Sequence, residues 1–167
     1  RGTLLRLRTA PIRRRQILLG KALAAFSACM LVQCMLLALG TLPYFSIWIS
    51  SVPLMILTTL TTSLGFAGLM MMLAGLTRTE GGAQGLGRAL VLVLAMIGGG
   101  TIPIFLMPGW LQTFSSISPF SWAVRAIDGY TWRAFSLEEM ALPLSVLAAF
   151  GIIGFIVGTV SMRWQEE

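Results

Sequence analysis

The stretch MALPLSVLAAFGIIGFIVGTVSM, residues 140–162, holds 23 residues without a charged side chain. A helix of this length measures about 34 Å, which is enough to cross the hydrocarbon core of a bilayer, about 30 Å thick. Backbone groups in that core must find their hydrogen bonds within the segment, so a single crossing segment has to be helical. Residues 140–162 therefore predict a membrane-spanning helix.

Three further stretches share this character: residues 22–42, 52–77 and 89–107. Across the whole chain 56% of residues are hydrophobic and only 11% are charged, whereas a soluble domain carries about 25% charged residues. This composition excludes a soluble fold. We therefore predict an all-α polytopic membrane protein, with residues 1–167 forming a single transmembrane domain of four spans.

The positions of the basic residues predict the orientation in the membrane. Seven of the twelve basic residues precede the first span, and no acidic residue lies among them. With both ends in the cytoplasm, ten basic residues lie inside, and only Arg125 and Arg133 lie outside, which agrees with the positive-inside rule. We therefore expect a multi-pass protein of the plasma (inner) membrane. The net charge of +6 is then a topology signal, and we expect membrane lipids and not nucleic acid as its partners.

The segment between the last two spans, residues 108–139, is too polar to span and unusually aromatic. Seven of the sixteen aromatic residues lie between Gly109 and Phe135, which is typical of material at a membrane interface. We predict an extracytoplasmic, re-entrant helical segment here, in which the spacing of Arg125 and Asp128 favours an ion pair. Its marker residues are Pro108, Trp110, Pro119 and Trp122.

Glycine and proline define the other breaks. The run at 78–88 contains four glycines and predicts a flexible cytoplasmic loop. Gly98 to Gly100 and Pro103 end or break the third span, either as a flexing helix end or as a static transition. Gly154 and Gly158 favour close helix packing over a hinge.

At the N-terminus, Leu4 and Leu7 have helical spacing, and Pro11 ends the short amphipathic helix. A basic ramp then leads to Lys21 at the start of the first span. The cluster Arg13 to Arg15 has two interpretations, which are anchoring to anionic headgroups and docking of a partner protein.

On-chain catalysis is not expected. The chain has no histidine, no phosphate-binding loop and no nucleophile elbow, and Cys29 and Cys34 are too far apart around a helix to pair. We therefore predict no catalytic residue, no metal and no cofactor. The predicted spans contain no Asp, Glu, Lys or Arg, so the energy for any transport is expected to come from outside the membrane.

The run RGTLLRLRTAPIRRRQILLGK, residues 1–21, resembles the cytoplasmic segment of type-two ABC exporter permeases. PGWLQ at 108–112, Ser118-Pro119 and Trp122-Ala123 are similar to the region of this family that dips into the outer leaflet. The resemblance implies the later two-thirds of a six-span permease. It also implies a separate ATP-binding subunit that hydrolyses ATP, and a second permease half, expected to be an identical chain.

The same resemblance makes the N-terminal segment a coupling helix that docks on the ATP-binding subunit. Its docking residues are Thr3, Leu4, Leu5, Arg6, Leu7, Arg8, Thr9 and Pro11. Polar residues on the first two spans are candidate pathway residues, although interhelical hydrogen bonding is the commoner use of such groups. They are Gln33, Thr58, Thr62 and Ser63. The alternative functions are a non-transporting scaffold, a passive pore and a membrane-embedded enzyme, the last of which needs a nucleophile and a base at membrane depth.

Overall fold

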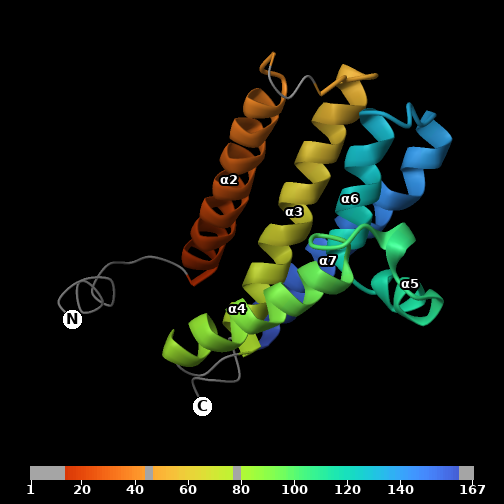
Figure 1. Ribbon diagram of the computed structural model, residues 1–167. Helices are drawn as coiled ribbons and strands as arrows, with labels where there is room; N and C mark the ends of the chain where they lie inside the picture. Colours follow the sequence, from red (N-terminus) through yellow and green to blue (C-terminus); the bar gives the residue numbers. More distant parts are fainter. Residues whose placement is uncertain (1–13, 44–46, 77–79, 162–167) are drawn as a thin grey trace.

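The computed structural model describes residues 14–43, 47–76 and 80–161, and within these ranges all regular structure is helical (Figure 1). In chain order the elements are α2 (Arg14–Gly40), α3 (Val52–Leu76), α4 (Glu80–Ile97), the 3-10 turn η1 (Ile104–Leu106), α5 (Gly109–Ser115), α6 (Pro119–Tyr130) and α7 (Leu137–Ser161). The described part of the chain contains no strand. The predicted all-α fold class is confirmed.

Three stretches of helix are long and apolar enough to cross a membrane. They are Leu19–Gly40 in α2, Val52–Gly75 in α3 and Leu137–Ser161 in α7. The predicted spans 22–42, 52–77 and 140–162 coincide with these helices. Helix α2 begins earlier, at Arg14, because the predicted basic ramp continues the helix without a break.

Helix α7 also begins earlier than its apolar run, and a capping box explains the difference. The backbone N–H of Ser136 donates to Glu139 Oε2 at 2.8 Å, and the Glu139 N–H donates back to Ser136 Oγ at 3.4 Å. This reciprocal pair satisfies two backbone donors that a helix start otherwise leaves free. The helix therefore starts at Leu137, immediately after Ser136.

The expected break of the third predicted span, residues 89–107, near Gly98 to Gly100 is confirmed, but the helix before the break is too short to be a span by itself. Helix α4 ends at Ile97, and its apolar part is only Gly87–Ile97. Eleven residues measure about 16 Å, roughly half of what a crossing needs. The described residues therefore contain three candidate spans and not four.

Glycine, not proline, ends α4. The Gly100 N–H donates to the Ala95 carbonyl at 2.8 Å, the Gly99 N–H faces the Met96 carbonyl at 3.4 Å, and Gly99 has a φ of +93°. This is the Schellman arrangement, which requires a residue in left-handed geometry after the helix. Pro103 comes only after this turn. The chain leaves α4 before the proline ring could clash.

The predicted flexible loop at 78–88 is also wrong, because α4 begins at Glu80 and includes most of this run. Each helical glycine costs about 1 kcal/mol relative to alanine. The glycine run nevertheless continues as helix directly into the apolar part of α4, Gly87–Ile97.

Helices α3 and α7 pack in parallel along a glycine seam. Gly65 lies against Leu147, Gly68 against Gly151 and Gly75 against Gly158, so the contacts advance in the same direction along both helices. A Cβ atom at Gly75 would lie 2.7 Å from the Gly158 carbonyl oxygen, which leaves no room for any side chain. The interpretation of Gly154 and Gly158 as packing residues is therefore confirmed.

Because α3 and α7 are parallel, the chain between them must return along the bundle, and it does so in two pieces. Gly87 of α4 lies beside Leu73, near the C-terminal end of α3, whereas the N–H of Ser50, just before α3, donates to the Tyr130 carbonyl at the end of α6 at 2.8 Å. Helix α4 makes the first part of the return and α6 the second (Figure 1).

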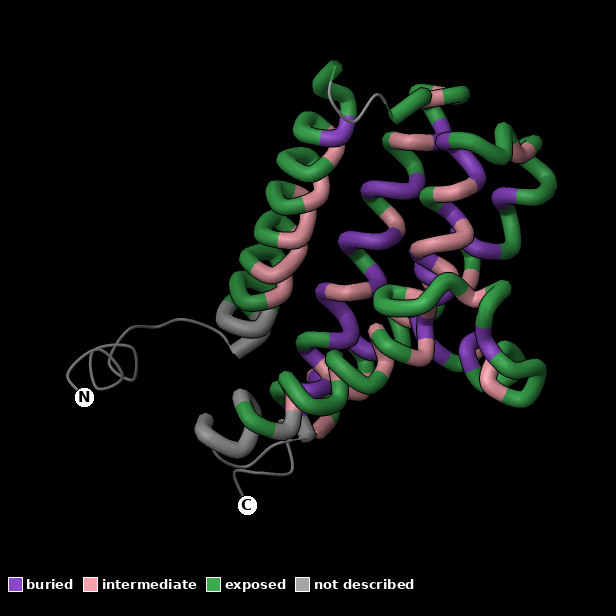
Figure 2. The backbone as a smooth tube through the Cα atoms, viewed as in Figure 1, coloured by how far each residue is buried: buried purple, intermediate pink, exposed green. Residues whose placement is uncertain are grey.

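Helix α2 lies at the side of this bundle and is mostly exposed along its length (Figure 2). It packs mainly against α3, whereas α3 also packs against α4, α6 and α7. The core lies between α3, α6 and α7, where Ala126, Met140 and Leu147 are fully buried.

Candidate functional site

The predicted docking segment lies outside the described residues. This applies to all of its members: Thr3, Leu4, Leu5, Arg6, Leu7, Arg8, Thr9 and Pro11. The coupling helix therefore stays a prediction.

The candidate pathway residues fall in two places. Thr58, Thr62 and Ser63 lie on α3 and are at most 2% exposed, whereas Gln33 lies half-buried on α2. The three buried hydroxyl groups have no hydrogen-bond partner among the described residues. Neighbouring Thr59, by contrast, donates to the Met55 carbonyl at 2.8 Å. A buried hydroxyl without a partner carries a desolvation cost, so these three groups need an explanation.

The marker residues of segment 108–139 define its local structure. Pro108 precedes α5 at the N-cap and Trp110 is exposed on that helix, whereas Pro119 is buried in the first turn of α6. Trp122 is half-buried, and its indole N–H donates to the Ser116 carbonyl at 2.7 Å. The two helices have 7 and 12 residues, so neither crosses a membrane alone.

Ser118 joins this segment to α4. Its hydroxyl donates to the Leu94 carbonyl at 2.7 Å and accepts the Phe120 N–H at 3.3 Å, so one side chain caps α6 and also satisfies a carbonyl at the end of α4. A Cβ atom at Gly98 would lie 2.8 Å from the Ser118 oxygen. The contact between α4 and α6 therefore depends on Gly98 and Ser118.

A cavity of about 820 Å³ lies between η1, α6 and the N-terminal part of α7. Its lining combines the charged residues Arg125, Asp128, Arg133 and Glu139 with aromatic and aliphatic side chains. This volume is within the usual range of small-molecule sites, and mixed linings of this kind are typical of them.

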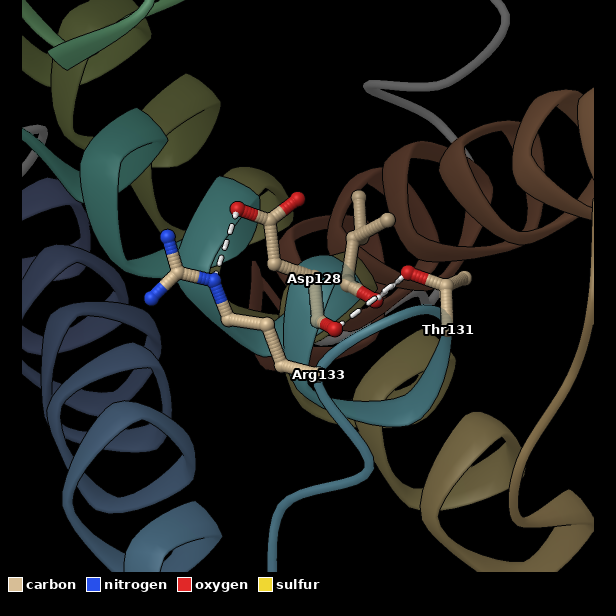
Figure 3. A network of polar contacts seen from close by, with 4 residues as sticks. Asp128, Thr131 and Arg133 are labelled. Atoms are coloured by element: carbon tan, nitrogen blue, oxygen red, sulfur yellow. Dashed lines mark hydrogen bonds and ion pairs between the residues drawn. The ribbon is translucent and has the colours of Figure 1, made fainter. Parts of the chain in front are cut away.

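The predicted pairing of Arg125 with Asp128 is wrong. Asp128 instead faces Arg133, whose Nε lies 3.8 Å from Asp128 Oδ2 (Figure 3). The Arg133 N–H also donates to the Asp128 carbonyl at 3.0 Å, and the Thr131 hydroxyl donates to the Ile127 carbonyl at 2.8 Å. The chain turns back on itself after α6, and this turn brings Arg133 to the carboxylate.

Arg125 has a different environment. Its guanidinium lies over the Trp122 ring, 4.9 Å from the centroid, and it forms no ion pair with any described residue. A guanidinium held on an aromatic face keeps its N–H donors at the ring edge available for an acceptor. Sequence spacing alone could not distinguish this arrangement from an ion pair within the helix.

Several of these functional contacts were missed from the sequence. The Ser136–Glu139 capping box had a recognisable signature, a serine followed three residues later by glutamate. The Ser118–Leu94 and Ser50–Tyr130 hydrogen bonds had none, because they join distant segments.

The three long apolar helices are those of an integral multi-pass membrane protein. The profile of the ABC-2 type transporter family matches residues 1–132, and the chain belongs to this family. It is the membrane permease component of an ABC transporter, and domains of this kind work with ATP-binding subunits. No curated protein and no solved structure matches the chain.

Proposed function

We propose that this chain forms the translocation pathway of an ATP-driven exporter in the plasma (inner) membrane, and that an ATP-binding subunit drives it through residues 3–9. The carrying observation is its membership of the ABC-2 type transporter family, together with predicted spans that contain no Asp, Glu, Lys or Arg. Without such groups, ion-coupled transport lacks its chemistry at membrane depth. A second copy of the chain is proposed to complete the pathway.

We further propose that the chain crosses the membrane four times. The parallel packing of α3 and α7 supports this, because two parallel spans require one return between them. The third crossing would start with α4 and be completed by α6, the part of the re-entrant segment 108–139 that joins α4 at Gly98 and Ser118, with the charged C-terminal half of α6 at the outer surface. An even number of crossings puts both ends on one side, and the distribution of basic residues favours the cytoplasm.

Reversing two charges in the docking segment tests the proposal. In the double variant Arg6→Glu, Arg8→Glu, we expect the stimulation of ATP hydrolysis by the permease to fall at least about tenfold, because like charges across an interface cost several kcal/mol. The measurement is ATPase activity of the full-length permease reconstituted with its ATP-binding subunit, together with co-purification of that subunit.

The matched control keeps both charges. Arg6→Lys, Arg8→Lys should retain most of the stimulated activity if long-range charge attraction guides docking. Comparable membrane insertion and elution volume for both variants would exclude misfolding. Full stimulation in the charge-reversal variant would contradict the docking role and favour a scaffold or a passive pore.

The buried hydroxyls on α3 give a second test, this time of the pathway. Thr62→Val keeps the shape of the side chain and removes a hydroxyl without a partner, so we expect the free energy of unfolding to stay constant or to rise by up to about 1 kcal/mol. If Thr62 faces the pathway during transport, export should nevertheless fall.

Thr59→Val is the matched control, on the same helix and with the same change. It removes the hydrogen bond to the Met55 carbonyl and should lower the free energy of unfolding by about 0.5–1 kcal/mol. Unfolding in mixed micelles measures both variants, and an export assay completes the comparison. Unchanged export in Thr62→Val would remove Thr62 from the pathway.

A further inference from the structure

The cavity between η1, α6 and α7 lies at the level where α7 enters its apolar run. Glu139 lines the cavity beside the start of α7, whereas Leu142 and Pro143 line it one turn further along. A candidate span begins at Leu137, so one end of the cavity lies near the membrane surface and the other extends toward its interior. A ligand filling the cavity would meet both charged and apolar side chains.

The charged groups of the cavity are unequally satisfied. Glu139 Oε2 accepts hydrogen bonds from the N–H and the hydroxyl of Ser136, at 2.8 and 3.0 Å. Asp128 faces Arg133. Arg125 is half-buried over Trp122 and has no carboxylate partner among the described residues. The two guanidinium groups and two carboxylates of the lining balance in charge, but Arg125 is the one charged group there that neither pairs with an opposite charge nor forms a capping hydrogen bond among the described residues, and its N–H donors favour an anionic group.

Aromatic rings hold both guanidinium groups in place. Arg125 lies over Trp122, and Arg133 lies 5.5 Å from the centroid of Trp132 and 6.0 Å from that of Phe135. One face of each of these rings is therefore already occupied by a cation. A planar guanidinium fixed in this way can form two parallel hydrogen bonds to a phosphate or a carboxylate.

Much of the remaining cavity lining is apolar. Ile104 and Phe105 of η1 line the cavity, as do Leu142 and Pro143 of α7. Phe105 and Leu142 are 71% and 60% exposed, so the apolar lining continues onto the surface of the protein. An acyl or alkyl chain could extend from the cavity along this surface.

The geometry points to this cavity as a binding site for an amphiphile. Arg125 would hold its anionic headgroup, and the apolar part of the amphiphile would lie between η1 and α7. A membrane phospholipid and an amphiphilic cargo molecule share this chemistry. The inference requires no ATP-binding subunit, so its failure and the failure of the proposed export function can be distinguished.

The test uses the full-length permease in an uncharged detergent, with two soluble short-chain lipids. Binding of dioctanoyl phosphatidylglycerol and of dioctanoyl phosphatidylcholine is followed through tryptophan fluorescence, because Trp122 and Trp132 line the cavity. We expect the anionic lipid to bind more tightly. Arg125→Gln should weaken its binding about tenfold or more, the effect of losing one charge-assisted contact.

Arg88→Gln is the matched control, because Arg88 is exposed on α4 and does not line the cavity. Asp128→Asn should change the affinity for the anionic lipid in the opposite direction. It removes the carboxylate that competes for Arg133 and should tighten binding about threefold. This variant keeps the test valid if Arg125→Gln does not fold. Equal affinities for the two lipids, or equal effects of Arg125→Gln and Arg88→Gln, would overturn the assignment.

A third ligand, hexyl phosphate, distinguishes a membrane phospholipid from an amphiphilic cargo molecule as the occupant of the site. If it binds competitively with the anionic lipid, the site accepts phosphate amphiphiles in general, as a cargo site would. If only the glycerolipid binds, the occupant is a membrane phospholipid. Both outcomes support the assignment of an anionic headgroup to Arg125.

Discussion

Replacing Gly154 with leucine is expected to lower the free energy of unfolding by about 3 kcal/mol, at the upper end of what overpacking costs. A Cβ atom at Gly154 would already lie 2.5 Å from the Gly68 carbonyl oxygen, and the obstacle is backbone that no rotamer change can move. Helices α3 and α7 would have to separate along their whole seam. Unfolding of the full-length permease in mixed micelles measures the effect.

Gly20→Leu is the matched control for this variant. Gly20 is exposed on α2, and nothing lies within 4 Å of the position that its Cβ atom would take. The same substitution should therefore change the free energy of unfolding by less than about 1 kcal/mol. If the two variants are equally stable, the close packing of α3 and α7 is refuted.

Replacing Gly98 with valine is expected to release α6 from the end of α4. A Cβ atom there would lie 2.5 Å from the Phe120 Cβ atom and 2.8 Å from the Ser118 oxygen, so the Ser118–Leu94 hydrogen bond could not survive. The combined cost of overpacking and of the lost bond is about 2 kcal/mol, which is roughly thirtyfold in local opening. Hydrogen exchange of the α6 amides should accelerate by this factor.

The control for this variant is Gly109→Val at the start of α5, where the substituted side chain meets open space. It should leave exchange in α6 unchanged. If the third crossing consists of α4 and α6 in series, Gly98→Val should also reduce export more than it reduces stability. Unchanged exchange in α6 for Gly98→Val would show that the two helices are not joined at this point.

The sequence predicted well those features that depend on one segment at a time. The long apolar stretches, the end of a helix near Gly98 and the inability of Cys29 and Cys34 to pair all follow from local composition and spacing, and the structure agrees with them. The assignment to the type-two permeases, made from residues 1–21 and 108–123, is confirmed by the match to the ABC-2 type transporter family.

The errors concern local rules that neighbouring segments outweighed. The helical structure of the apolar part of α4 continues back through the glycines at 81–87. The Schellman turn at Gly99 ends this helix before the break expected from Pro103. Arg125 and Asp128 have the spacing of a helical ion pair, yet Trp122 and Arg133 compete for them. A pairwise rule cannot rank such competitors, because their distances are set by the turn after α6.

The amino-acid order alone determined that the chain enters a membrane and which stretches enter it, because transfer into lipid depends on hydrophobicity summed over about twenty neighbouring residues. Only the tertiary structure decided that α3 and α7 run parallel with their glycines in contact, and that a cavity with the unpaired Arg125 lies beside α7. Those features depend on backbone approaches between segments far apart in the chain. Inside a membrane, close packing and polar contacts determine which segments come together, because hydrophobicity does not distinguish one apolar face from another.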